Sequence, residues 1–194
     1  MRSVLTPIRA RVLAALLVLA TSAPAAAQQQ RPAQSLSPRD TVRLELDGGR
    51  KMYVDYGRPS MRGRKIVGEL VPYGRVWRTG ANAATTLVTE ADLRIGDAVV
   101  PRGTYTLYTL PTQQGWTLIV NRQTGQWGTQ YDASRDLVRI PMRVSTLPRP
   151  VEQFTIALER GTARNAGTLA MAWENTRLSV PIRVQAPAAP RPRR

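Results

Sequence analysis

The stretch "RLSVPIRV", residues 177–184, decides the fold class of this chain. Its polar and apolar side chains alternate strictly, and successive side chains of a β-strand point to opposite faces, so it predicts a half-buried strand. Pro181 has no amide hydrogen to donate, so we expect it at an open edge or a bulge. The apolar face of this strand consists of Leu178, Val180, Ile182 and Val184.

The same alternation recurs along the centre of the chain, whereas no stretch of a dozen residues after residue 27 keeps a helical stripe. "DGG" at residues 47–49 separates two alternating runs and predicts a hairpin. Many short strands predict an all-β, single-domain antiparallel β-sandwich of about nine or ten strands. A jelly-roll or galactose-binding-like order is compatible with this pattern, which does not specify strand order. The other alternating runs are residues 42–46, 52–56, 116–120, 138–144, 154–158 and 169–173.

The two ends of the chain differ from its centre. Residues 1–27 combine arginines, a short apolar run and small residues before Gln28, which predicts a cleaved signal peptide. Residues 28–37 are polar and predict a flexible linker, residues 38–185 form the domain, and residues 186–194 predict a disordered Pro/Arg tail. The apolar run is shorter than the ~20 residues that span a bilayer. We therefore expect a periplasmic or secreted protein without a transmembrane segment in the mature chain.

Two residue types are missing from the whole sequence, cysteine and histidine. The absence of cysteine excludes disulfides and the attachment residue of bacterial lipoproteins. The absence of histidine removes the usual base near neutral pH and the commonest metal ligand. Ser-His and Cys-His catalysis are excluded, and we expect no catalytic residues, no metal and no cofactor.

The chain is strongly basic, with 28 Lys and Arg against 13 Asp and Glu. Such a charge attracts nucleic acids, acidic polymers and anionic headgroups. The excess of arginine over lysine is also typical of GC-rich coding sequences. An exported chain without a recognisable nucleic-acid motif predicts no nucleic-acid partner. The partner that we expect is a small anionic or carbohydrate ligand.

Two long connections interrupt the strands, residues 57–82 and 121–135, and long loops in a compact domain are often functional. In the first, "GELVPYGRVWRTGANAATTL" (68–87) places a tryptophan between arginines. One hypothesis puts an anionic or sugar ligand against an indole wall. The alternative is that the indole plugs one end of the sandwich, because large aromatic side chains mostly pack. The candidate binding residues here are Tyr73, Trp77, Arg78 and Asn82.

The same connection begins with a basic cluster, "YGRPSMRGRK" at residues 56–65. Arg58 and Arg64 are candidate ligands for phosphate or carboxylate, and a solvated loop is the alternative. Ser60 and Lys65 do not have the Ser-x-x-Lys spacing of a nucleophile pair.

The second connection contains Trp127, flanked by amide and hydroxyl side chains that suit a sugar. A surface loop anchored by the indole is the alternative. Asp132, Ser134 and Asp136 begin like a calcium loop, but the later positions fail, so they predict a capped turn.

Carboxylates for glycoside hydrolysis exist in the sequence, but their separation does not follow from it. Asp92 and Asp97 flank "LRIG" and are typical of turns. A hydrolase without His or Cys is therefore the third functional hypothesis.

Five long motifs stand out in the sequence: "YGRPSMRGRKIVGELVPYGRVWRTGANAATTL", "PRGTYTLYTLPTQQGWTLIVNRQTGQWGTQYD", "DLVRIPMRV", "PVEQFTI" and "LAMAWENTRLSVPIRV". They resemble one bacterial family, the domain of unknown function 2911. The resemblance spans residues 37–184 and implies a compact, exported single domain with no established activity, so no catalytic role carries over. The chain departs from the family pattern at Ala83, where relatives have an acidic residue.

These observations leave three hypotheses. The first is a non-catalytic small-ligand or glycan-binding module of the cell envelope, and the second is a structural or protein-interaction domain of the periplasm. Exposure separates them: binding predicts Trp77 or Trp127 in an open cleft with Arg78 and Asn82, whereas a structural role predicts both indoles buried. The hydrolase hypothesis requires two carboxylates that face each other across that cleft, or a buried Lys65.

Overall fold

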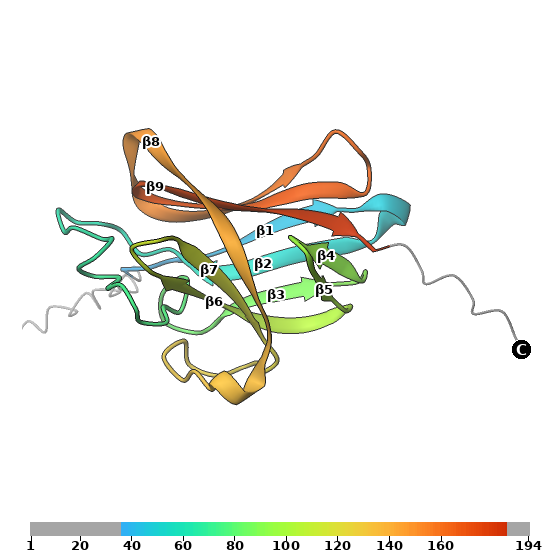
Figure 1. The fold of residues 1–194 in the computed structure, drawn as a ribbon, viewed down its shortest axis with the longest axis horizontal. Helices are drawn as coiled ribbons and strands as arrows, with labels where there is room; N and C mark the ends of the chain where they lie inside the picture. The colour runs from blue at the N-terminus through green and yellow to red at the C-terminus, as the bar shows by residue number, and fades with distance from the viewer. Residues whose placement is uncertain (1–35, 186–194) are drawn as a thin grey trace, which may run out of the picture. The chain divides into compact units, whose positions relative to one another are not determined.

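The computed structural model describes residues 36–185, and these are nearly all β-structure (Figure 1). The all-β prediction is confirmed. The predicted signal peptide, most of the predicted linker and the predicted tail lie outside the described residues. The strands are β1 (Arg39–Glu45), β2 (Lys51–Gly57), β3 (Thr85–Thr89), β4 (Leu93–Ile95), β5 (Ala98–Val100), β6 (Gly103–Pro111), β7 (Trp116–Asn121), β8 (Asp136–Arg160) and β9 (Ala166–Val184), with short 3₁₀ turns η1 (Asp47–Gly49) and η2 (Ala133–Arg135).

The nine strands form one antiparallel sheet in the order β1-β2-β3-β6-β7-β8-β9-β4-β5. The two layers of the sandwich are parts of this single sheet, because β8 belongs to both. Its first part pairs with β7 up to Met142, and from Arg143 onward it pairs with β9. Figure 1 shows β8 running across the molecule between the two layers.

Pro181, predicted at an open edge or a bulge, lies near this crossing, and so does Pro141. Pro141 is opposite Thr117 of β7, just before β8 changes partner. Pro181 lies beyond the last β8 pair of β9, and its carbonyl accepts a hydrogen bond from Gly96 N. The prediction for Pro181 is confirmed, because β9 has a neighbouring strand on only one side there.

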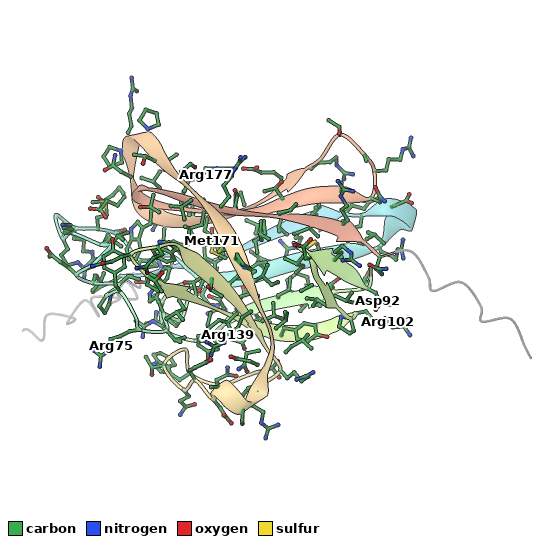
Figure 2. All side chains as sticks on the ribbon, viewed as in Figure 1. Arg75, Asp92, Arg102, Arg139, Met171 and Arg177 are labelled. Carbon is green, nitrogen blue, oxygen red and sulfur yellow. The ribbon has the colours of Figure 1, made fainter. Side chains whose placement is uncertain are left out.

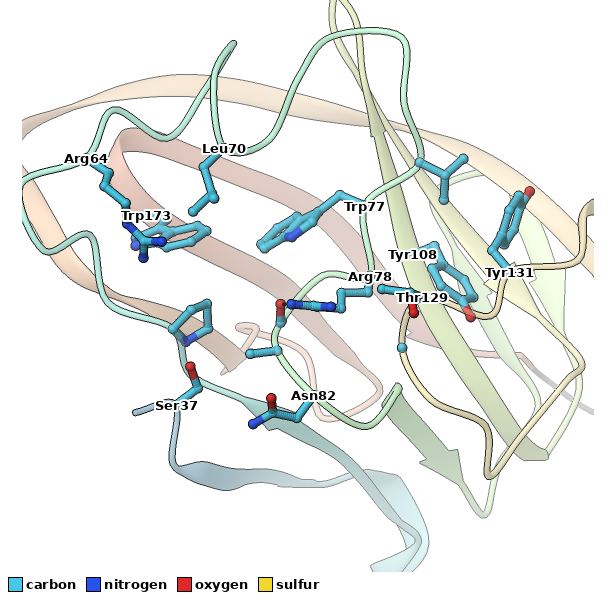
Figure 3. A pocket seen from close by; sticks show the side chains of 15 residues that line it. Ser37, Arg64, Leu70, Trp77, Arg78, Asn82, Tyr108, Thr129, Tyr131 and Trp173 are labelled. Atoms are coloured by element: carbon cyan, nitrogen blue, oxygen red, sulfur yellow. Dashed lines mark hydrogen bonds between the residues drawn. The ribbon is translucent and has the colours of Figure 1, made fainter. Parts of the chain in front are cut away.

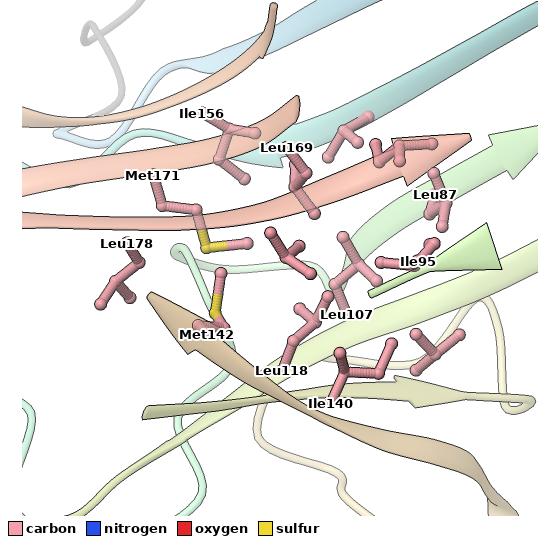
Figure 4. Close-up of a cluster of buried hydrophobic side chains, with 14 of the residues drawn as sticks. Leu87, Ile95, Leu107, Leu118, Ile140, Met142, Ile156, Leu169, Met171 and Leu178 are labelled. Carbon is pink, nitrogen blue, oxygen red and sulfur yellow. The ribbon is translucent and has the colours of Figure 1, made fainter. Parts of the chain in front are cut away.

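The core fills the space between the layers and consists of the predicted apolar rows (Figure 4). Leu118 and Val120 of β7, Met171 of β9 and Ile182 of β9 are all buried. Val144 differs, since it was expected on the inner face with Ile140 and Met142 but is 45% exposed. It lies two residues beyond Met142, the last residue of β8 that pairs with β7.

The free edge of β8 is closed by a side chain. The Tyr56 hydroxyl accepts a hydrogen bond from Ile156 N (2.9 Å) and donates to Ile156 O (3.3 Å), which gives both backbone groups a partner. An uncovered strand edge is a template for association, so this contact protects the sheet. The predicted β1–β2 hairpin is also confirmed, with η1 as its turn.

Candidate functional site

The connection between β2 and β3 begins by adding backbone to the free edge of β8. Met61 N donates to Glu152 O and Phe154 N donates to Pro59 O, each at 2.8 Å. Arg58 is part of this seam, because its guanidinium bonds Asp40, Phe154 O and Thr155. Arg58, which was predicted to contact a ligand, thus bonds β1 through Asp40 and β8 through Phe154 O and Thr155.

The middle of this connection is folded onto the sandwich. Ile66 and Val71 are almost completely buried, and Val71 N donates to Ile66 O. Val67 N donates to the Glu174 carboxylate on β9. The loop is a packed element, so the side chains that it carries are held in fixed places.

Trp77 connects this loop to the core. Its backbone exchanges two hydrogen bonds with Thr109 of β6 (2.7 and 2.9 Å). Its ring stacks on Trp173 at a centroid distance of 5.6 Å and meets the edge of Phe154 at 4.9 Å. The Trp173 indole N–H donates to Glu152 O. The indole is half-buried, so it packs and at the same time keeps a surface toward solvent.

After Trp77 the chain turns sharply back to β3. Thr79 and Asn82 have φ of 52° and 64°, a left-handed conformation that asparagine tolerates better than most residues. Gly57 lies directly under this turn, where a side chain would collide with Ala81 O. The close crossing fixes Arg78 and Asn82 on the same side of the turn.

The second long connection reaches this turn from the opposite direction. Gly128 N donates to Asn82 O (2.9 Å), and Ala83 and Trp127 form an isolated β-bridge. A side chain at Gly128 would approach Asn82 O and Arg78 Cδ to within 3 Å, so the glycine is packed against the stem of Arg78. The two connections, distant in sequence, therefore build one site.

Polar side chains hold the second connection. Asp132 accepts hydrogen bonds from Ser134 N and Oγ, which confirms the predicted capped turn. Asp136 accepts from Asn121, Tyr131 and Arg139. Burial and the hydrogen bond to the Asp136 carboxylate raise the pKa of Tyr131 to about 12, so its hydroxyl keeps its proton and donates at neutral pH.

Between the two connections lies a cleft of about 430 Å³ (Figure 3). Trp77 and Trp173 form its aromatic wall, and Arg64, Arg78 and Asn82 surround the opening. The remaining lining residues are Ser37, Pro59, Leu70, Val76, Gly80, Ala81, Tyr108, Gly128, Thr129 and Tyr131.

The cleft is rich in hydrogen-bond donors. Arg78 Nε donates to Gly80 O, but within residues 36–185 its two terminal nitrogens have no partner. In the same range the Asn82 side chain and the Trp77 indole N–H make no hydrogen bond. Arg64 donates to Met61 O and Ser60 O and forms no ion pair there. Among the described residues, no aspartate or glutamate lines the cleft, so no carboxylate there neutralises the guanidinium charges and an acceptor-rich anion suits the site.

The structure thus brings together four of the seven predicted binding residues: Arg64, Trp77, Arg78 and Asn82. Tyr73 and Trp127 lie outside the cleft and are 44% and 51% exposed, and Arg58 is in the seam to β8. The sequence interpretation missed Tyr108, Tyr131 and Trp173. Trp173 belongs to the alternating row 169–173, but this row predicted only a strand with a buried face and no binding site.

Of the two carboxylates named beside the hydrolase hypothesis, Asp92 has a structural partner, since it accepts from Arg102 N. Another carboxylate, Glu90, accepts from Lys51 N. Lys65 is exposed. Within residues 36–185, no group of three metal-binding side chains gathers and no helix has the length and hydrophobicity to cross a bilayer.

A family model matches residues 37–182 of the chain, and its description is "Protein of unknown function (DUF2911)". The match covers most of the described residues, including both connections that form the cleft. No curated protein and no solved structure shows significant similarity to the chain.

Proposed function

Because the chain belongs to the DUF2911 family, whose function is unknown, we propose its function from the cleft: it is an exported envelope protein that binds a small anionic ligand without catalysis. The observation that carries this proposal is the set of unpaired donors around Arg78 in a cleft without a carboxylate. An ionised carboxylate group accepts hydrogen bonds and donates none, so it matches a site in which donors outnumber acceptors.

The aromatic wall adds a second requirement on the ligand. Trp77 and Trp173 present a rigid apolar surface, because each ring is fixed by the other and by Phe154. A ring-shaped ligand with one anionic group, such as a sugar acid, uses both the indole surface and the guanidinium. A neutral sugar lacks the negatively charged acceptor that matches the Arg78 guanidinium.

The test compares glucuronate with glucose, which share a ring and differ in one carboxylate. We expect glucuronate, or inorganic phosphate as the smallest anion, to raise the melting temperature of the mature protein, whereas glucose has no effect. Arg78→Gln removes the charge and should weaken anion binding at least tenfold in calorimetric titration, about the 1.4 kcal/mol of one charge-assisted hydrogen bond.

Arg75→Gln is the matched control, because Arg75 is exposed and does not line the cleft. It should bind the anion as the wild type does. Equal stabilisation by glucose and glucuronate, or no stabilisation by any anion, would contradict the proposal.

The second candidate is a structural or protein-interaction domain, and the packing of Trp77 favours it. The indole stacks on Trp173 and completes an aromatic cluster with Phe154 and Tyr56. Under this alternative the cleft binds no small molecule, and Arg78→Gln changes neither stability nor ligand response.

A further inference from the structure

The first connection carries an exposed surface that adjoins the cleft and shares Leu70 with it. We name it the cationic rim and define it as Arg62, Lys65, Leu70, Tyr73 and Arg75, all of them exposed. Leu70 and Tyr73 are apolar side chains with 42% and 44% of their surface exposed. Exposed apolar side chains next to several cations mark an interaction surface more often than single exposed residues do.

The rim is one continuous piece of structure. Leu70 N donates to Lys65 O, and Val71 N donates to Ile66 O, which closes the loop onto itself. The Tyr73 ring lies over Gly68, whose missing side chain leaves room for it. The backbone N–H of Arg62 donates a hydrogen bond to the Glu152 carboxylate, which fixes the backbone at this position. Leu70 and Tyr73, the tips of the rim, are therefore held in place on a packed loop.

The charge of this region is compensated only in part, because the Glu152 and Glu174 carboxylates accept hydrogen bonds from Arg62 N and Val67 N but, among the described residues, pair with none of its cations. Residues 58–78 contain six basic residues and one acidic residue, Glu69. Within residues 36–185 only Arg58 of these six forms an ion pair, with Asp40. Cations elsewhere on the domain have acidic partners, such as Arg139 with Asp136 and Arg177 with Glu159.

We propose that the cationic rim docks onto an anionic lipid bilayer. Each Lys or Arg near such a surface contributes about 1 kcal/mol, and Tyr and Leu at the tips enter the interfacial region, where a ring with an apolar body and a polar hydroxyl is favoured. A soluble polyanion matches only the charges and leaves Leu70 and Tyr73 in water. The combination therefore favours a bilayer over a soluble polymer.

The experiment measures sedimentation of the mature protein with phosphatidylcholine vesicles that contain or lack phosphatidylglycerol. We expect binding only with phosphatidylglycerol, and weaker binding at high salt. The triple variant Arg62→Gln, Lys65→Gln, Arg75→Gln should lower the partition coefficient about a hundredfold, from the loss of three charges.

A matched control removes three charges elsewhere. Arg102, Arg160 and Arg164 are exposed residues outside the first connection, and Figure 2 shows Arg102 far from Arg75. Their replacement by Gln makes the same change in net charge and should reduce binding much less. Equal loss in the two triple variants would overturn the proposal, since only total charge would then matter.

A second variant tests the apolar part at constant charge. Leu70→Ser with Tyr73→Ser should weaken vesicle binding severalfold, because both side chains enter the interface. Unchanged vesicle binding in this variant, or heparin binding that matches vesicle binding in every variant, would identify a polyanion surface and overturn the proposal. Equal binding to vesicles without phosphatidylglycerol would also overturn it.

Of the rim residues only Leu70 also lines the cleft, so the charge variants test the rim separately from the cleft. Arg78→Gln should keep vesicle binding, whereas the rim variants that spare the cleft, Lys65→Gln and Arg75→Gln, should keep the response to glucuronate. Failure of one proposal thus leaves the other standing.

Discussion

Trp77 and Trp127 lie in the two long connections that meet at the cleft, yet their surroundings differ. Trp77 stacks on Trp173 and touches Phe154, and it is half-buried. Trp127 is 51% exposed and its ring contacts no other aromatic ring in the described residues. Its loop is held by hydrogen bonds of Asn121, Asp132 and Asp136 instead.

The difference shows two ways to fix a loop on a β-scaffold. Burial of apolar surface is non-directional and large, so one connection gains stability from Ile66, Val71 and Trp77. A polar network gains less, but its directional bonds set the shape of the other connection. The cleft needs both, because Arg78 comes from the first connection and Gly128, which packs on it, comes from the second.

The largest expected effect is that of Trp77→Ala. It removes the ring that Trp173 and Phe154 contact, and we expect the free energy of unfolding to fall by about 3 kcal/mol, measured by urea denaturation. Trp77→Phe keeps an aromatic side chain and should recover part of the loss. A loss below about 1 kcal/mol would mean that the cluster does not anchor the loop.

Gly128→Ala tests the contact between the two connections. The added methyl group would approach Asn82 O and Arg78 Cδ at 2.7 and 2.8 Å, so one of them must move. We expect a loss of about 1–3 kcal/mol in urea denaturation and weaker binding of glucuronate. Gly115→Ala is the control, since no atom lies within 4 Å of the added carbon. Equal behaviour of the two variants would refute the close contact.

The third prediction concerns alkaline pH. The pKa of Tyr131 is raised from 10.0 to about 12 in the folded protein, so the folded state holds its proton longer than the unfolded state. This contribution is complete below pH 10 and is lost as pH rises toward 12. Tyr131→Phe should therefore show a shallower decrease of stability over this range. The free energy of unfolding measured at several alkaline pH values checks this, and identical slopes would contradict it.

The smallest effect is expected for Trp127→Ala. The ring is half-exposed and the loop is held by other side chains, so stability should change by no more than about 0.5 kcal/mol. Binding of glucuronate should also stay unchanged, because Trp127 does not line the cleft. A large loss of stability or of binding would mean that Trp127 anchors its loop or supports the cleft as Trp77 does.

Much of the fold could be predicted because the signal is local. Alternating side chains indicate a strand wherever one face is buried, and the rows 116–120 and 178–184 are both in strands. The capped turn at Asp132 was predictable for the same reason, since a side chain bonds backbone two residues away. Val144 was the exception, as its exposure depends on where β8 changes partner.

The candidate site was predictable only in part. Trp77, Arg78 and Asn82 are close in sequence, so one loop places them together. Trp173 and Tyr131 come from β9 and from the second connection, and no local pattern relates them to Arg78. Arg58 and Arg64 show the opposite case, because they are close in sequence but separate in the structure. Arg58 lies in the seam to β8, whereas Arg64 lines the cleft.

The amino-acid sequence by itself determined the alternating strands β1, β2, β7, β8 and β9, the two long connections and the absence of histidine and cysteine chemistry, because these depend on side-chain type and on a period of two. Only the tertiary structure decided that β8 belongs to both layers, that the two connections meet at Gly128, and that one tryptophan is packed while the other is exposed. These features depend on contacts between residues far apart in the chain, and the pairing of distant strands is not encoded in the alternation of neighbouring side chains.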